Sequence, residues 1–134
     1  MIHLIYFSSA TKEMGEDDLI SLLEESRDRN KRQNVTGMLL YKDGAFLQVL
    51  EGEAKDVDEM YQCICFDERN AGNYLVERKE IEERNIPQWS MGFENLNNYQ
   101  PDDLGAYSTI FKKGATPEEI AKHKDLAVSL LLKF

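Results

Sequence analysis

Apolar and polar residues follow one another along the chain in two kinds of pattern. Short apolar, β-prone stretches predict strands, and apolar residues three and four positions apart predict helices. Before residue 97 the sequence predicts strands over 2–8, 38–42, 45–50, about 74–82 and 89–94, and helices over 15–30 and 54–67. The order β-α-β-β-α-β-β predicts one sheet accompanied by two helices.

One predicted strand is apolar on both of its faces. Phe46 and Leu47 are adjacent in it, and so are Val49 and Leu50. Successive side chains of a strand point to opposite sides, so this pattern predicts a sheet that is buried on both sides. The two predicted helices can cover one of these sides.

Residues 98–134 predict a helical extension. Its clearest signal is Thr116-Pro117-Glu118-Glu119, which combines an N-cap, a proline at the first helical position and a capping-box glutamate. An apolar face follows it at Ile120, Ala127, Leu130 and Leu131. We therefore expect a domain over 1–97, and an extension over 98–134 that covers the second side of the sheet, relays a signal or forms a subunit contact.

The composition fits one globular domain. The chain has 134 residues, of which 42% are hydrophobic, enough for a core of its own. The net charge of −9 repels phosphate backbones and argues against direct binding of nucleic acid. A basic cluster is the exception, at Arg27, Arg29, Lys31 and Arg32. These cations either complement the dipole at the end of the first helix or hold a phosphate group of a ligand.

The sequence contains no pattern typical of a signal peptide or a membrane span. Cys63 and Cys65 lie two positions apart on a predicted helix, where they point in different directions and cannot pair with each other. Reduced thiols favour a cytoplasmic protein. The two histidines, His3 and His123, are far apart in sequence and predict no metal site.

Gln48 is the most unusual residue of the predicted core. It lies inside the apolar strand 45–50 and shares a face with Phe46 and Leu50. A buried amide needs partners for its donor and acceptor groups. Gln48 therefore either bonds to backbone groups or faces a polar ligand.

Both predicted helices end their buried face with a polar side chain. Asn30 lies eleven residues after Leu19 and extends the predicted buried stripe of Leu19, Leu23 and Ser26. Asp67 likewise extends the predicted stripe of Val57, Met60 and Ile64. Either residue alone is explained by a capping or solvated role. Together with Gln48 they suggest polar groups that converge on one heteroaromatic ligand.

Two further pairs share a strand face. Tyr6 lies beside Ser8 on the first strand and offers a phenol that forms hydrogen bonds and can be oxidised. Trp89 and Met91 share a face of the last strand, where core packing is the simpler interpretation. The sequence has no Gly-rich phosphate loop and no evident nucleophile–base set. These patterns alone predict an α/β domain with a candidate pocket.

At these positions the sequence resembles the BLUF family, sensors of blue light using flavin. The matching segments occur in family order and spacing over about residues 1–97: 6–10, Asn30, 35–41, 44–52, 67–69 and 89–91. The stretch 46–52, with Tyr6 before it and 89–91 after it, is the most specific part. The resemblance implies an α+β, ferredoxin-like sheet with a flavin ring between the first two helices, usually as FAD, with FMN or riboflavin as alternatives.

The resemblance also implies roles for individual residues. Tyr6 would donate an electron to the excited flavin, and Gln48 would be the switch that bonds both the tyrosine and the ring. The residues implied to hold or border the cofactor are Ser8, Arg29, Asn30, Asp67 and Arg69, and those implied to relay the signal are Trp89, Ser90 and Met91. One departure is Asn70, where the family often has a histidine.

The predicted function is a non-catalytic blue-light photoreceptor. Its signal would pass to an unidentified partner protein or through a change of homo-oligomer. A flavin-dependent redox enzyme is the first alternative, but it needs substrate access and an acid or base at the ring, and neither is signalled. A flavin-free interaction module is the second, and the complete set of Tyr6, Asn30, Gln48 and Asp67 argues against it.

Overall fold

The computed structural model of the protein describes residues 1–12, 14–85 and 92–95. It contains five strands and two helices within those residues: β1 (Ile2–Ala10), α1 (Glu16–Arg32), β2 (Thr36–Lys42), β3 (Ala45–Gly52), α2 (Ala54–Phe66), β4 (Asn70–Glu80) and β5 (Gly92–Asn95). The predicted helices of 98–134, and the predicted start of the last strand at 89–91, lie outside the described residues.

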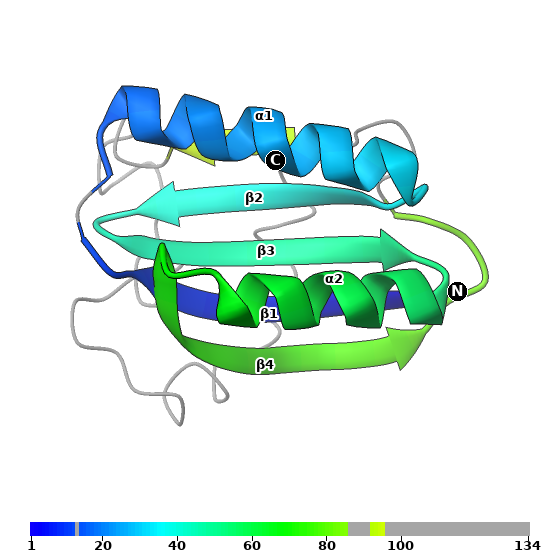
Figure 1. Ribbon diagram of the computed structural model, residues 1–134. Coiled ribbons are helices and arrows are strands. Elements are labelled where there is room, and N and C mark those ends of the chain that lie inside the picture. The colour runs from blue at the N-terminus through cyan, green and yellow to red at the C-terminus, as the bar shows by residue number, and fades with distance from the viewer. Residues whose placement is uncertain (13, 86–91, 96–134) are drawn as a thin grey trace.

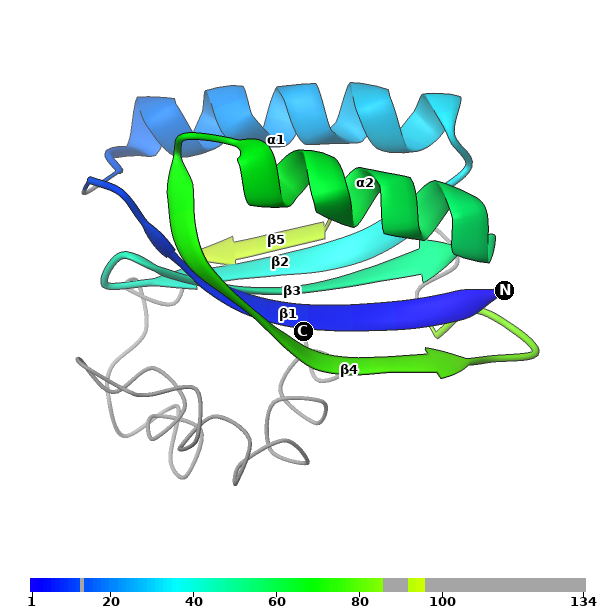
Figure 2. The same cartoon turned by 60° about the horizontal axis from the view of Figure 1, so that its bottom comes forward.

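The strands form one sheet in the order β4-β1-β3-β2-β5. Neighbouring strands are antiparallel except for β2 and β5, which are parallel. Both helices lie on the same side of this sheet, as Figures 1 and 2 show. The prediction of an α+β, ferredoxin-like arrangement with two helices on one face is confirmed.

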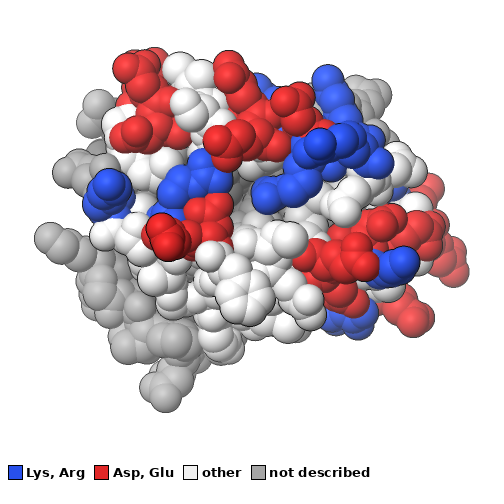
Figure 3. Space-filling view, in the orientation of Figure 1, with Lys and Arg blue, Asp and Glu red and all other residues white. Residues whose placement is uncertain are grey.

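Local signals explain most element boundaries. Helix α1 has three acidic residues in its first turn and three basic residues in its last, as its dipole favours. Figure 3 shows acidic side chains over the beginning of α1 and basic side chains at its end. The β2–β3 hairpin turns at Asp43 and Gly44, whose φ angles of 49° and 81° are those of the predicted tight turn.

Strand β4 differs from its prediction, because it begins at Asn70 and not at Tyr74. Its first residues pair with the end of β1, where Ala10 faces Asn70 and Ser9 faces Ala71. Apolar and polar side chains do not alternate in these residues, so their sequence does not indicate a strand. The boundary is therefore fixed by hydrogen bonding to β1, a partner distant in sequence.

The main core lies between the helices and the sheet. Its helix residues are the predicted ones, Leu19 and Leu23 of α1 and Val57, Met60 and Ile64 of α2. Strand β3 is buried on both of its sides, as its sequence predicts, with both Leu47 and Leu50 0% exposed. Neither of the helices in the described part of the chain is long and apolar enough to cross a membrane.

Candidate functional site

A hydrogen bond between two core side chains marks the candidate site. Tyr6 of β1 and Gln48 of β3 face each other in the antiparallel register, and the Tyr6 hydroxyl donates to Oε1 of Gln48. Both side chains are only 4% exposed. Directly opposite residues share one side of a sheet, so both point towards the helices. The structure thus joins the two residues that the sequence predicts as a photochemical pair.

A pocket opens beside this pair, between α1, α2 and the sheet. Its wall combines apolar and polar groups, as binding sites for heteroaromatic ligands do. The residues that line it are Tyr6, Ser8, Leu22, Ser26, Arg29, Leu39, Phe46, Gln48, Ile64, Asp67, Arg69 and Asn70. The sequence assigns several of the described residues to the cofactor. With one exception, they all line this pocket.

The exception is Asn30, which lies next to the pocket without lining it. Asn30 is 0% exposed and continues the buried stripe of α1 one turn beyond Ser26. Its backbone carbonyl accepts hydrogen bonds from the amides of Gln33 and Val35, which end the helix. Asn30 is therefore fixed by the helix end at the edge of the polar region.

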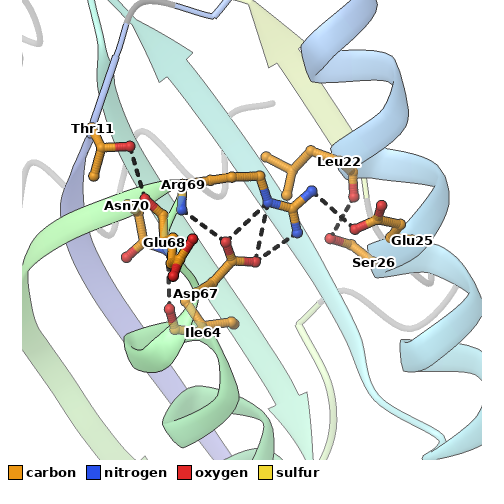
Figure 4. A network of polar contacts seen from close by, with 9 residues as sticks. All are labelled: Thr11, Leu22, Glu25, Ser26, Ile64, Asp67, Glu68, Arg69 and Asn70. Atoms are coloured by element: carbon orange, nitrogen blue, oxygen red, sulfur yellow. Dashed lines mark hydrogen bonds and ion pairs between the residues drawn. The ribbon is translucent and has the colours of Figure 1, made fainter.

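Arg69 joins the two helices across the mouth of the pocket (Figure 4). Its guanidinium lies 2.6 Å from Oδ2 of Asp67, which follows α2, and 2.9 Å from Oε2 of Glu25 on α1. The hydrogen bond from Arg69 holds the pKa of Asp67 below its usual value. The same hydrogen bond raises the pKa of Arg69. Both groups are therefore charged at neutral pH and present fixed polar atoms to the pocket.

The environment of Tyr6 keeps its phenol neutral. Burial raises the pKa of Tyr6 well above its usual value, and the positive charge of Arg29 only partly opposes this effect. The Tyr61 ring of α2 packs against Tyr6, with 5.3 Å between the ring centroids. Burial also raises the pKa of Tyr61 itself to about 12. Tyr6 is thus a protonated hydrogen-bond donor at neutral pH.

Several buried polar atoms of the pocket lack a hydrogen-bond partner among the described residues. They are Oγ of Ser8, Nε of Arg29 and Oδ1 of Asn70. Buried polar atoms without a partner are rare in folded proteins, because each costs about 1–3 kcal/mol. A donor, an acceptor and a hydroxyl that can both donate and accept suit the polar edge of a planar ligand such as a flavin, and the cavity of about 30 Å³ between them would have to widen to admit its ring.

The sequence did not single out Ser26 as a pocket residue, nor Glu25 or Tyr61 as neighbours of the site. Ser26 offered a usable signal, since it lies one helical turn before Asn30 on the same stripe. Glu25 and Tyr61 have no such signal, because their partners Arg69 and Tyr6 come from other elements.

The predicted relay residues Trp89, Ser90 and Met91 lie outside the described residues. Strand β5 begins directly after them at Gly92 and pairs with β2.

A family model for sensors of blue light using FAD, the BLUF family, matches residues 1–92. Among curated proteins, the chain is similar to a photoactivated adenylate cyclase subunit beta-like protein of Euglena gracilis, with 34% identity over 89 residues. This alignment covers 66% of the chain and 10% of that protein. A blue light- and temperature-regulated antirepressor of Escherichia coli is 26% identical over 123 residues, which are 89% of the chain and 30% of that protein.

Solved structures agree with the sequence matches. BlrB, a BLUF protein solved in its dark state, superposes with a TM-score of 0.72 at 28% identity, covering 96% of both chains. A bacterial light-regulated adenylyl cyclase superposes with a TM-score of 0.77 at 26% identity, covering 99% of this chain and 40% of that one.

These matches place the chain in the class of flavin-binding sensors of blue light. The five-stranded sheet with two helices on one face agrees with that class. The chain belongs to the BLUF family.

Proposed function

We propose that this chain is a non-catalytic blue-light photoreceptor in which Tyr6 and Gln48 form the switch. The observation that carries the proposal is the hydrogen bond from Tyr6 to Gln48 at the wall of the polar pocket. An oxidisable phenol there contacts an amide that has both a donor and an acceptor group. No other pair of described pocket residues combines these two properties.

The polar groups around the pocket suit a flavin ring. Ser8, Arg29 and Asn70 offer the buried atoms described above. Asp67 and Arg69 offer a fixed carboxylate and guanidinium at the mouth, and Asn30 offers an amide at the inner edge. These residues would hold the edges of the ring and fix its orientation towards Gln48.

The form of the flavin that we propose is FAD. A second cavity of about 420 Å³ adjoins the mouth of the pocket, and Arg69 lines both. Its wall also carries the hydroxyl residues Thr11 and Ser21, the cation Lys12 and one carboxylate, Asp18. Hydroxyls and cations are the groups that bind phosphate oxygens. They favour a phosphorylated flavin, FAD or FMN, over riboflavin, and the family description, which names FAD, favours FAD of these two.

A bound flavin would supply a strong one-electron oxidant when it absorbs blue light. Tyr6 would give an electron to this oxidant, and its phenolic proton would pass to Oε1 of Gln48, which would release a proton from its nitrogen to the same oxidant. The Gln48 amide would then rotate or shift to its imidic tautomer, so that its donor and acceptor groups exchange places. Return of the electron and proton to Tyr6 would restore the original hydrogen bond.

The signal would pass to a partner protein or through a change of homo-oligomer, without catalysis in this chain. The cyclase relatives suggest such a division, because the part that matches this chain is about a tenth of their length. A cytoplasmic location suits the two free cysteines, Cys63 and Cys65, which are both exposed.

The first test is the absorption spectrum of the purified protein in the dark and after a blue flash. A flavin band that shifts slightly to the red and recovers in the dark is the expected result. A bound flavin without a reversible shift would contradict the switch, and steady oxidation of a nicotinamide donor would favour a redox enzyme instead. A protein that neither contains nor takes up flavin would leave the interaction module as the better account.

A further inference from the structure

Arg84 forms a clasp at the end of the sheet nearest the start of β2. Its Nη1 donates to the Thr36 hydroxyl and to the backbone carbonyl of Glu51, both at 2.8 Å. Its Nη2 donates to the carbonyl of Asn34 at 2.6 Å. One guanidinium thus holds the loop after α1, the first residue of β2 and the end of β3.

The next residue strengthens this clasp. The Asn85 amide donates to Oε2 of Glu51 at 3.1 Å, and Glu51 is 0% exposed although it is a carboxylate. The same corner is closely packed, because a Cβ added at Gly52 would lie 3.3 Å from the carbonyl oxygen of Asn34. Arg84 and Asn85 therefore bind a corner that has little room to move.

The clasp is connected to the strand of the candidate switch and, along the chain, to the last strand. Gln48 and Glu51 are three residues apart on β3, so the clasp holds the strand that carries the switch. On its other side, Asn85 is separated from β5 by the six residues 86–91. Figure 1 shows the segment after β4 rising from the edge of the sheet towards the end of α1.

A second path joins the switch to β5 through the sheet itself. Leu39 of β2 faces Gln48 on one side and Phe93 of β5 on the other. The side chain of Phe93 packs against the main core. Strand β5 is therefore linked to the switch strand laterally through Leu39, and Arg84 lies in the segment of chain between β4 and β5.

From this placement we propose that Arg84 is a positioning residue for signalling: it holds the chain after β4 against the ends of β2 and β3, so that a change at Gln48 reaches β5. The inference rests on the proposed light-switch function. Arg84 is not among the residues that line the pocket, so we expect its replacement to leave flavin binding and the red shift in place.

The test compares Arg84→Gln with Arg78→Gln in the full chain with flavin bound. Arg78 is a matched control, because it is an arginine of β4 whose ion pair with Asp58 is exposed. For each protein, hydrogen–deuterium exchange of 92–95 is measured in the dark and under blue light, beside the flavin spectrum and the thermal midpoint. The light-minus-dark difference in exchange reports coupling, whereas a purely structural role would change only the midpoint.

We expect Arg84→Gln to keep the red shift while the light-minus-dark difference over 92–95 falls by about threefold or more. Arg78→Gln should keep both. An unchanged difference in Arg84→Gln would overturn the inference, and so would a lost red shift, which would place Arg84 in the switch itself. If the wild-type protein shows a red shift but no light-minus-dark difference in exchange at β5, the inference about Arg84 is wrong, while the proposed photoreceptor function stands. A wild type without a red shift would refute the proposed function first.

Arg84→Lys covers the case in which the glutamine variant does not fold. Lysine keeps the charge, but its single ammonium cannot reproduce the fork that spans the three acceptors. We expect an exchange difference between those of the wild type and Arg84→Gln, with an unchanged red shift. A full difference in a folded Arg84→Lys would show that charge alone is sufficient and would contradict the clasp.

Discussion

Tyr6 and Gln48 face each other across the antiparallel β1–β3 pair, and the Tyr6 hydroxyl donates a hydrogen bond to the Gln48 side chain. They are 42 residues apart in sequence, and the strand register alone brings them together. A flavin bound beside Gln48 would contact one member of this hydrogen-bonded pair, and the two strands hold both side chains in place. Strands are stiffer supports than loops, which suits a switch that must return to one starting geometry.

Gln48→Leu should abolish the light-induced red shift while flavin stays bound. Leucine has nearly the same size as glutamine but cannot exchange a donor for an acceptor. Absorption spectra before and after a blue flash measure the shift, and the flavin-to-protein absorbance ratio measures binding. A normal, reversible shift in the leucine variant would remove Gln48 from the mechanism.

Tyr6→Phe should likewise remove the reversible shift, because phenylalanine keeps the ring but loses the hydroxyl that donates to Gln48. Tyr74→Phe is the matched control, since Tyr74 faces Phe7 and not the residues of the pocket. Transient absorption after a laser flash follows both variants. Equal responses in Tyr6→Phe and Tyr74→Phe would exclude Tyr6 as the electron donor.

Arg69→Gln should weaken flavin binding by about tenfold, the loss expected when one charged hydrogen-bond donor at the ligand is removed. Its ion pairs with Asp67 and Glu25 are partly exposed, so the free energy of unfolding should change by less than about 1 kcal/mol. Titration of the flavin-free protein with FAD measures affinity. Arg78→Gln should bind FAD like the wild type, and a shared loss in both variants would point to overall charge instead of Arg69.

Leu47→Ala and Leu50→Ala should each lower the free energy of unfolding by about 2–5 kcal/mol, because both leucines are fully buried. They lie on opposite sides of β3, so equal costs would show that both sides of the sheet are stabilising. Leu75→Ala is the control, since Leu75 is 42% exposed and should cost much less. Denaturant unfolding gives all three values, and a cost at Leu47 no larger than at Leu75 would contradict burial of that side.

Stability should fall in alkali because of Tyr6. Burial raises the pKa of Tyr6 above the value of about 10 that it has in the unfolded chain. The contribution of Tyr6 to the free energy of unfolding is thus complete below about pH 10. It is lost as the pH rises towards the pKa of Tyr6 in the folded protein, by about 1.4 kcal/mol per pH unit. Denaturant unfolding between about pH 9 and pH 11 should show a flatter decline in Tyr6→Phe than in the wild type. Parallel curves would show that Tyr6 ionises as freely in the folded state as in the unfolded one.

Local sequence patterns were sufficient to predict many of the buried residues of this molecule. The stripe of Leu19, Leu23, Ser26 and Asn30 has helical spacing, so its burial followed directly from the sequence. The apolar run of β3 predicted two buried sides for the same kind of reason, because side chains alternate along a strand. Gln48 stood out because a lone amide in such a run requires a partner. The roles of Tyr6 and Gln48 came from the family resemblance, since periodicity carries no information about chemistry.

Contacts between distant segments were decided by the tertiary structure alone. The early start of β4 depends on its pairing with β1, the helix-to-helix bridge depends on the reach of Arg69 to Glu25, and the Tyr61 ring meets Tyr6 only after α2 packs on the sheet. The sequence determined which residues are buried and which polar side chains need partners, because these properties depend on neighbours along the chain. Which partners they find depends on register and packing, which join residues from elements far apart in sequence.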